Sequence, residues 1–213
     1  MHPNAAGDQS HKLQRAIDEA ASTHAPLWLA PGVYHAGDLK LRAGSRLIGV
    51  RGETRIALTQ GPSLISAQGV NAATLTDLTF DGGRQPLAPD GGLVNFTAAN
   101  FLRIVNCTVT AAGGNGVACF QCSGEVSGNT VTDAADNALF SSDSRLAIRA
   151  NRIASFGYGG IRVWHSVKRS DGSLIEGNTI EDTFARAGGT GQNGNAINVY
   201  RAGNVTVRNN VIR

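Results

Sequence analysis

The residues best suited to do chemistry lie at matching positions in the last three copies of a repeated strand-like segment. The copies are GLVNF (92–96), GVACF (116–120), ALFSS (138–142), GIRVWHS (160–166) and AINVYRA (196–202), aligned on an inward aliphatic taken as Leu93, Val117, Leu139, Ile161 and Ile197. Four residues after that aliphatic, the last three copies reach Asp143, His165 and Arg201. Because stacked strands lie about 4.8 Å apart, we expect these three side chains to form an exposed column.

Together these three groups are suited to acid–base chemistry. A histidine beside a carboxylate can act as a general base or acid, which assigns that role to His165 with Asp143. A guanidinium can stabilise the negative charge that develops on a sugar carboxylate during β-elimination or epimerisation, which assigns that role to Arg201. His165, Asp143 and Arg201 are therefore the candidate catalytic residues.

Four outward positions beside that column predict a ligand surface. Trp164 and Tyr200 occupy one outward position in successive copies, and Arg162 and Asn198 occupy another. An aromatic ring suits the apolar face of a sugar, and a guanidinium can pair with a uronate carboxylate through two parallel hydrogen bonds. We therefore expect Trp164, Tyr200, Arg162 and Asn198 to bind substrate.

A purely structural interpretation of the same residues stays open. Solenoids stack side chains on their outer faces for packing alone. The strand can also turn before the column position, which would scatter Asp143, His165 and Arg201. An exposed histidine beside an aspartate is more often a surface pair than a catalytic one.

A second repeated segment predicts the architecture that positions these residues. Its copies are LTDLTF (75–80), LRIVNCTV (102–109), EVSGNTV (125–131), LAIRANRI (146–153), LIEGNTI (174–180) and VTVRNNVI (205–212). The shared asparagines are Asn129, Asn151, Asn178 and Asn210, which we interpret as an inward structural ladder bonding the backbone at a corner. A strand-like repeat of 22 to 32 residues indicates a β-solenoid.

One domain is expected over residues 1–213. An apolar stripe at helical spacing predicts a capping helix over 8–24. Short apolar runs between Pro and Gly turns predict irregular first strands over 25–63, followed by regular rungs over 64–213. The insertion at 181–195 marks one face, and insertions in solenoids often mark the binding face.

Composition and charge exclude several classes of function. The 213 residues include 27 glycines and only 6% aromatic and 16% charged residues, which favours a loop-rich all-β fold. The net charge of +3 comes without a basic run or face, so no nucleic-acid partner is expected. No apolar stretch approaches the ~20 residues of a membrane-spanning helix.

The cysteines and the chain ends give three further expectations. Cys107, Cys119 and Cys122 match no zinc pattern and are expected to be buried thiols, with a Cys119–Cys122 disulfide as the alternative. The N-terminus shows no export signal, so either the protein stays inside the cell or its targeting peptide is missing from this sequence. The C-terminus falls within a strand-like segment and would leave a bare sheet edge, so we expect the natural chain to continue.

Longer motifs point to a known group of proteins. They are residues 8–20, APLWLAPGVYHAGDLKL (25–41), TLTDLTFDGG (74–83), NALFSSDSR (137–145), GGIRVWHS (159–166) and AGGTGQNGNAINVYRAGNV (187–205). The first three resemble the pectin-lyase-like superfamily, and the last three resemble its twin-arginine-translocated β-helix repeat family. The resemblance implies an all-β, right-handed, single-stranded parallel β-helix with one N-terminal helix, exported to the periplasm or beyond. It implies no catalytic residues, because that family has no established activity.

Familiar signatures of enzymes in that superfamily are absent from the sequence. The polygalacturonase motifs N-T-D, D-D, G-H-G and R-I-K do not occur, nor does the Asp-Pro-His element of mannuronan epimerases. Asp133 and Asp182 share a register but lie two rungs apart, about 10 Å, whereas one calcium ion gathers ~6–8 oxygen ligands. We therefore predict no metal and no cofactor.

Two functional hypotheses follow. The first is an exported, pectate-lyase-like protein that acts on or binds an acidic polysaccharide, as a lyase, hydrolase, epimerase or glycan-binding protein. The second is a non-catalytic extracytoplasmic β-helix that serves as a structural or surface-binding element. The aromatic and arginine stack favours the first, the missing catalytic signatures favour the second, and the oligomeric state is left open.

Overall fold

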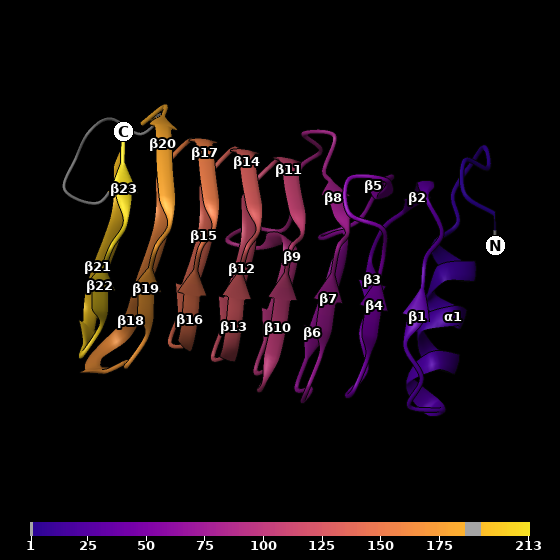
Figure 1. Cartoon of the computed structure of the whole chain (residues 1–213), viewed down its shortest axis with the longest axis horizontal. Helices are drawn as coiled ribbons and strands as arrows, with labels where there is room; N and C mark the ends of the chain where they lie inside the picture. The colour runs from indigo at the N-terminus through magenta and orange to yellow at the C-terminus, as the bar shows by residue number, and fades with distance from the viewer. Residues whose placement is uncertain (1, 186–192) are drawn as a thin grey trace.

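Parallel strands of two to twelve residues stack along one axis, with a helix at the N-terminal end (Figure 1). The computed structural model describes residues 2–185 and 193–213, so the 181–195 insertion is described only at its two ends. Within the described residues the chain has one helix, α1 (Ser10–Ser22), which lies inside the predicted 8–24. None of the described helical structure is long and apolar enough to cross a bilayer.

Three parallel sheets form the sides of the solenoid, and each full turn, or rung, adds one strand to each sheet. Sheet A comprises β1 (Leu27–Trp28), β4 (Arg46–Ile48), β7 (Thr74–Thr76), β10 (Leu102–Val105), β13 (Ser123–Ser127), β16 (Arg145–Arg149), β19 (Leu174–Glu176) and β22 (Thr206–Arg208). Sheet B comprises β2 (Gly32–Ala36), β5 (Thr54–Leu58), β8 (Thr79–Asp81), β11 (Thr108–Ala112), β14 (Thr130–Ala134), β17 (Arg152–Phe156), β20 (Thr179–Thr183) and β23 (Val211–Ile212). Sheet C comprises β3 (Leu39–Lys40), β6 (Ile65–Gln68), β9 (Gly92–Thr97), β12 (Asn115–Phe120), β15 (Asn137–Ser142), β18 (Gly159–Ser170) and β21 (Asn195–Gly203). The predicted all-β solenoid is confirmed.

Inward side chains of successive rungs fill one continuous core. One column, in sheet A, pairs in register and consists of the buried residues Leu47, Leu75, Ile104, Val126, Ile148 and Ile175. At the N-terminal end, α1 packs Leu13, Ile17 and Ala21 against the first rungs. Burial of a large aliphatic side chain contributes about 1.5–3 kcal/mol, so Leu13 and Ile17 hold the helix over the end of the core.

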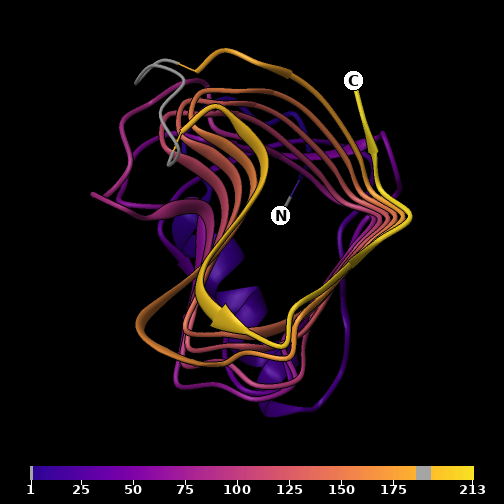
Figure 2. The ribbon, with the colours of Figure 1, turned by 90° about the vertical axis from the view of Figure 1, so that its left-hand side faces the viewer.

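The asparagines of the repeat form a hydrogen-bonded ladder at the sharp corner between sheets A and B, which keeps its place from rung to rung (Figure 2). Asn129 donates its backbone N–H and its Nδ2 to Oδ1 of Asn151, both at 3.0 Å. Asn151 makes the same pair of bonds to Asn178 at 3.0 and 2.9 Å, and Asn178 makes them to Asn210 at 2.9 Å. The ladder therefore supplies partners for backbone groups that leave the sheets at the corner.

The register of sheet C differs from the sequence alignment in one rung. Val117 pairs with Val94 rather than with Leu93, whereas the alignment of Val117, Leu139 and Ile161 is observed. Leu93 and Val94 are adjacent aliphatic residues and are both buried, so alternation could not tell which one faces the core.

The three cysteines are free and buried, so the alternative Cys119–Cys122 disulfide is absent. Burial raises the pKa of the Cys107 thiol to about 12. A hydrogen bond between the other two thiols lowers the pKa of Cys122 and, together with burial, raises that of Cys119.

Candidate functional site

The corner after sheet C positions the predicted catalytic residues, and it is built differently in one rung. Ala98, Gln121, Asp143 and Arg201 turn the chain in the left-handed region, with φ of 51°, 56°, 50° and 55°. His165 holds the corresponding place but does not turn, because β18 runs on to Ser170 and its register against β21 shifts beyond Trp164. The extra residues project from the side of the solenoid as the orange loop at the lower left of Figure 2.

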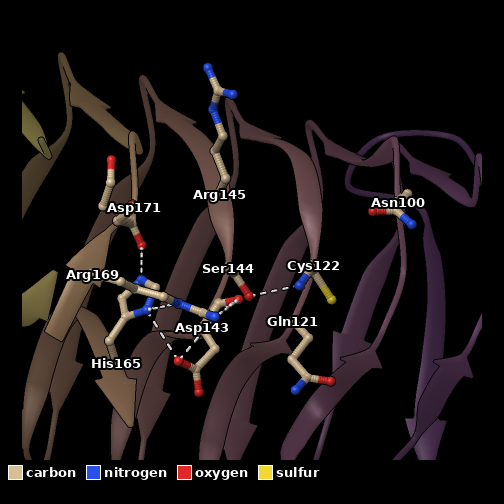
Figure 3. Close-up of a pocket in the computed structure, with 10 residues that line it drawn as sticks. Asn100, Gln121, Cys122, Asp143, Ser144, Arg145, His165, Arg169 and Asp171 are labelled. Carbon is tan, nitrogen blue, oxygen red and sulfur yellow. Dashed lines mark hydrogen bonds and ion pairs between the residues drawn. The ribbon is translucent and has the colours of Figure 1, made fainter. Parts of the chain in front are cut away.

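His165 is buried as a result, with 2% of its surface exposed. Its Nε2 lies 2.7 Å from Oδ2 of Asp171, and its Nδ1 lies 3.1 Å from Oδ1 of Asp143 (Figure 3). Arg169 donates its Nε–H to the same Nδ1 at 2.8 Å. Both ring nitrogens are therefore engaged by protein groups, which leaves neither of them to exchange a proton with a ligand in this arrangement.

The two carboxylates that hold His165 also hold the loop that follows it. Asp143 Oδ1 accepts hydrogen bonds from the backbone N–H and Oγ of Ser166 at 3.2 Å, and Arg169 Nη2 lies 3.2 Å away. Asp171 Oδ1 accepts the backbone N–H of Ser173 at 2.7 Å. We call Asp143, His165, Arg169 and Asp171 the His165 cluster. Their contacts hold the projecting loop against the rung before it.

The predicted exposed column of Asp143, His165 and Arg201 is wrong in two respects, while the catalytic role of these residues stays a prediction. His165 faces inward rather than outward, because the strand continues where the other rungs turn. Arg201 does not join the other two: its Nη1 donates to the backbone oxygen of Ser166 at 2.9 Å, and its guanidinium lies 5.0 Å from the centre of the Tyr200 ring. Arg169 contacts Asp143 and His165 instead.

Sequence reasoning missed Arg169 and Asp171. Both lie in a stretch that lengthens the repeat from 22 residues, between Asn129 and Asn151, to 27 residues, between Asn151 and Asn178. That longer interval was the available signal that the strand does not turn at His165.

The four predicted substrate-binding residues do share the outer face of sheet C. Trp164 pairs with Tyr200 in register, and their rings stack with centroids 6.4 Å apart and planes at 15°. Arg162 pairs with Asn198, and the Arg162 guanidinium lies 5.7 Å from the centre of the Phe140 ring. The outer face thus joins a flat aromatic pair to a cation.

A cleft of about 360 Å³, the sheet C cleft, lies on this face. It is lined by Phe120, Phe140, Tyr158, Arg162 and Trp164, with the polar residues Asp90, Asn115, Asp136, Asn137 and Ser142. Arg162 is half-buried, its Nε is shielded and lacks a hydrogen-bond partner, and its guanidinium has no ion pair among the described residues. A half-buried guanidinium without an ion pair suits an anionic or hydroxyl-rich ligand, while Asp90 and Asp136 in the same lining offer acceptors to hydroxyl groups.

A second cleft of about 460 Å³, the corner cleft, lies beside the His165 cluster (Figure 3). Its lining residues are Asn100, Gln121, Cys122, Asp143, Ser144, Arg145, His165, Arg169, Ser170 and Asp171. Figure 3 shows Arg145 extending away from the His165 cluster. No group of three His, Cys, Asp or Glu side chains within residues 2–185 and 193–213 is placed to hold a metal ion.

Comparison with known proteins places this geometry in a family. The profile of the right-handed β-helix region matches residues 91–213, which is more than half of the chain. The chain belongs to the right-handed β-helix family. This also establishes the handedness of the predicted fold.

One solved structure shows the same fold over the length of this right-handed β-helix, and a second is similar more loosely. The structure of a candidate glycosyl hydrolase from Parabacteroides merdae aligns over 100% of this chain and 94% of the hydrolase chain, with 13% sequence identity and a TM-score of 0.62. The A-module of the Azotobacter vinelandii mannuronan C-5 epimerase AlgE4 aligns over 97% of this chain and 94% of the module, with 17% sequence identity and a TM-score of 0.41. A search of curated protein sequences gave no match.

Proposed function

We propose that this right-handed β-helix binds an acidic glycan on the outer face of sheet C. The proposal rests on one observation: the stacked Trp164 and Tyr200 rings lie beside a half-buried Arg162 that forms no ion pair with any described residue. The ring faces suit the apolar face of a sugar, and the guanidinium suits its carboxylate. Asn198 pairs with Arg162 in register and lies on the same outer face of sheet C.

The energetics of the sheet C cleft favour a ligand that carries its own negative charge. Arg162 is half-buried and forms no ion pair with a described residue, so a ligand that brings an anion or several acceptors completes its interactions. An aromatic platform alone would also hold neutral sugars, whereas Arg162 adds a preference for uronates.

Binding is better supported than catalysis at the residues first assigned to catalysis. A general base needs a nitrogen within reach of the substrate proton, and both nitrogens of His165 already contact Asp143, Arg169 or Asp171. Arg201 bonds to the projecting loop rather than to that cluster. The catalytic assignment of His165, Asp143 and Arg201 therefore becomes the alternative that the experiment must separate.

The finer family resemblance adds a location to the proposal. The motifs NALFSSDSR (137–145) and GGIRVWHS (159–166), which resemble the twin-arginine-translocated repeat family, build the platform and its corner. We include export to the periplasm or beyond in the proposal on that ground. Detection of the protein in a periplasmic or secreted fraction of its native cells would test it.

The test combines binding with product detection. Isothermal titration with polygalacturonate, alginate and the neutral polymer dextran should give binding to the acidic polymers, lost in Trp164→Ala and weakened in Arg162→Gln. Trp28→Ala is the matched control, because Trp28 lies on the first rung and is 67% exposed. Ultraviolet absorbance of unsaturated products should stay at background in both the native protein and His165→Ala.

Two results would overturn the proposal. Equal binding of acidic polymers by the native protein and Trp164→Ala would remove the platform from the function. Unsaturated products formed by the native protein but not by His165→Ala would restore the lyase assignment.

A further inference from the structure

Consecutive residues on three successive rungs line the two clefts. Phe120, Ser142 and Trp164 line the sheet C cleft, and in each rung the very next residue lines the corner cleft. Those next residues are Gln121, Asp143 and His165. The corner cleft therefore begins, in sequence, where the sheet C cleft ends, at the turn that follows the strands of sheet C.

The polar groups of the corner cleft are divided unequally between acceptors and donors. Oδ1 of Asp143 and both oxygens of Asp171 are already engaged by His165, Arg169, Ser166 and Ser173. The side chains of Gln121 and Arg145, in contrast, have no hydrogen bond or ion pair with any described residue. What the cleft still offers a ligand is the N–H donors of Gln121 and Arg145, together with two acceptors, the Gln121 amide oxygen and Asp143 Oδ2.

Arg169 adds a second guanidinium to the lining of the corner cleft. Its Nε and Nη2 are used by His165 and Asp143, which fixes the plane of the group, while 49% of its side chain is exposed. A guanidinium fixed in this way loses little conformational freedom when it binds an oxyanion, because its orientation is already set. The buried His165–Asp171 pair beneath it makes the wall rigid.

We propose that the corner cleft is an oxyanion-binding subsite that takes a negatively charged group of the same glycan that occupies the sheet C cleft. The proposal rests on the proposed glycan binding and extends it: the ligand runs along the strands, and a carboxylate or sulfate further along its chain lies between Arg145 and Arg169. The clefts measure about 360 and 460 Å³, each within the range of about 300–1,000 Å³ that suits a small-molecule site. Affinity should therefore depend on ligand length as well as on charge.

The experiment uses oligosaccharides of defined length and charge on the whole chain. Isothermal titration compares digalacturonate with hexagalacturonate, and each of them with its fully methyl-esterified form. We expect the charged hexasaccharide to bind about tenfold or more tightly than the charged disaccharide, because only the longer chain reaches both clefts. Esterification should remove most of that gain.

Arg145→Gln is the diagnostic variant, and Arg149→Gln is its control. Arg149 lies on the same strand, β16, and is exposed like Arg145, but it pairs with Glu176 and lines neither cleft. Arg145→Gln should reduce the affinity for the charged hexasaccharide about fivefold to tenfold and leave the disaccharide unchanged. Arg149→Gln should leave both unchanged, and urea unfolding checks that the two variants fold alike.

The outcomes separate this inference from the proposed function. If the disaccharide binds at Trp164 but length brings no gain, or Arg145→Gln has no effect on the gain, the subsite is wrong and the platform stands. If neither ligand binds, both proposals fail. Titration with inorganic phosphate distinguishes a glycan subsite from a site for a free anion: if Arg145→Gln weakens phosphate binding but leaves the length gain of the hexasaccharide intact, the shared-ligand inference is overturned.

Discussion

His165 Nε2 lies 2.7 Å from Oδ2 of Asp171, a carboxylate with no exposed surface. The pair closes a loop that sits directly after the Trp164 platform. On the other side of the ring, Nδ1 accepts a hydrogen bond from Arg169, and Asp143 Oδ1 lies 3.1 Å from the same nitrogen. A histidine held on both sides fixes the chain rather than exchanging protons. The same pair therefore supports the platform and explains why His165 is a poor acid–base candidate.

Removal of Asp171 should destabilise the protein strongly. Asp171→Ala leaves His165 Nε2 and the backbone N–H of Ser173 buried without partners, and loss of one partner of a buried pair costs about 3–5 kcal/mol. We expect the midpoint of urea unfolding to fall accordingly. Glu19→Ala, at an exposed carboxylate of α1, should leave the midpoint nearly unchanged.

A double-mutant cycle checks that this cost belongs to the pair. If His165 and Asp171 act together, His165→Ala combined with Asp171→Ala should cost clearly less than the two single changes added. Simple additivity would show that the two side chains stabilise the fold separately.

The asparagine ladder should be most sensitive in its middle. Asn151→Ala removes the acceptor for two Asn129 donors and the donor to Val126, all buried, and each unpaired buried group costs about 1–3 kcal/mol. Asn210 is half-buried and ends the ladder, so Asn210→Ala should cost less. Chemical unfolding of both variants compares them directly, and an equal cost would contradict the ladder as the source of stability.

Stability should fall at alkaline pH because of buried groups that resist ionisation. Burial raises the pKa of Cys107 from 9.0 to about 12, and it also raises the pKa of Tyr34. A raised folded-state pKa means that the stabilisation is complete below the unfolded-state pKa and is lost as the pH rises toward the folded-state value. Cys107 alone should therefore reduce the free energy of unfolding by up to about 1.4 kcal/mol per pH unit between roughly pH 9 and pH 12.

Cys107→Ala isolates that contribution. The variant should lose less stability than the native protein over the same alkaline range when unfolding is followed by circular dichroism. Parallel curves for the two proteins would show that the thiol does not carry the effect.

The repeat made the solenoid predictable from the sequence. Every rung must provide hydrogen-bond partners for the backbone at the same corner. The same asparagine therefore recurs, with an aliphatic residue after it, at Asn129, Asn151, Asn178 and Asn210. The outer pair Trp164 and Tyr200 was predictable for the same reason, since both lie within strands whose register repeats.

The corner chemistry was not predictable because it depends on a break in that repeat. Alternation within a strand could not show that β18 continues past Trp164, and this continuation turns His165 inward. The partners Arg169 and Asp171 lie in the inserted residues, for which no other rung provides a template. The predicted register at Leu93 was wrong for a different reason. Leu93 and Val94 are adjacent buried aliphatic residues, so the sequence pattern fits either register.

The fluorescence of Trp164 during glycan titration tests the proposed binding face most directly. The chain has two tryptophans, so Trp28→Phe leaves Trp164 as the sole reporter, stacked on Tyr200. Hexagalacturonate should change the Trp164 emission saturably, with the same dissociation constant as in calorimetry. Arg162→Gln should raise that dissociation constant about tenfold. Calorimetric binding with no change in Trp164 emission, or no binding at all, would contradict a glycan site on the outer face of sheet C.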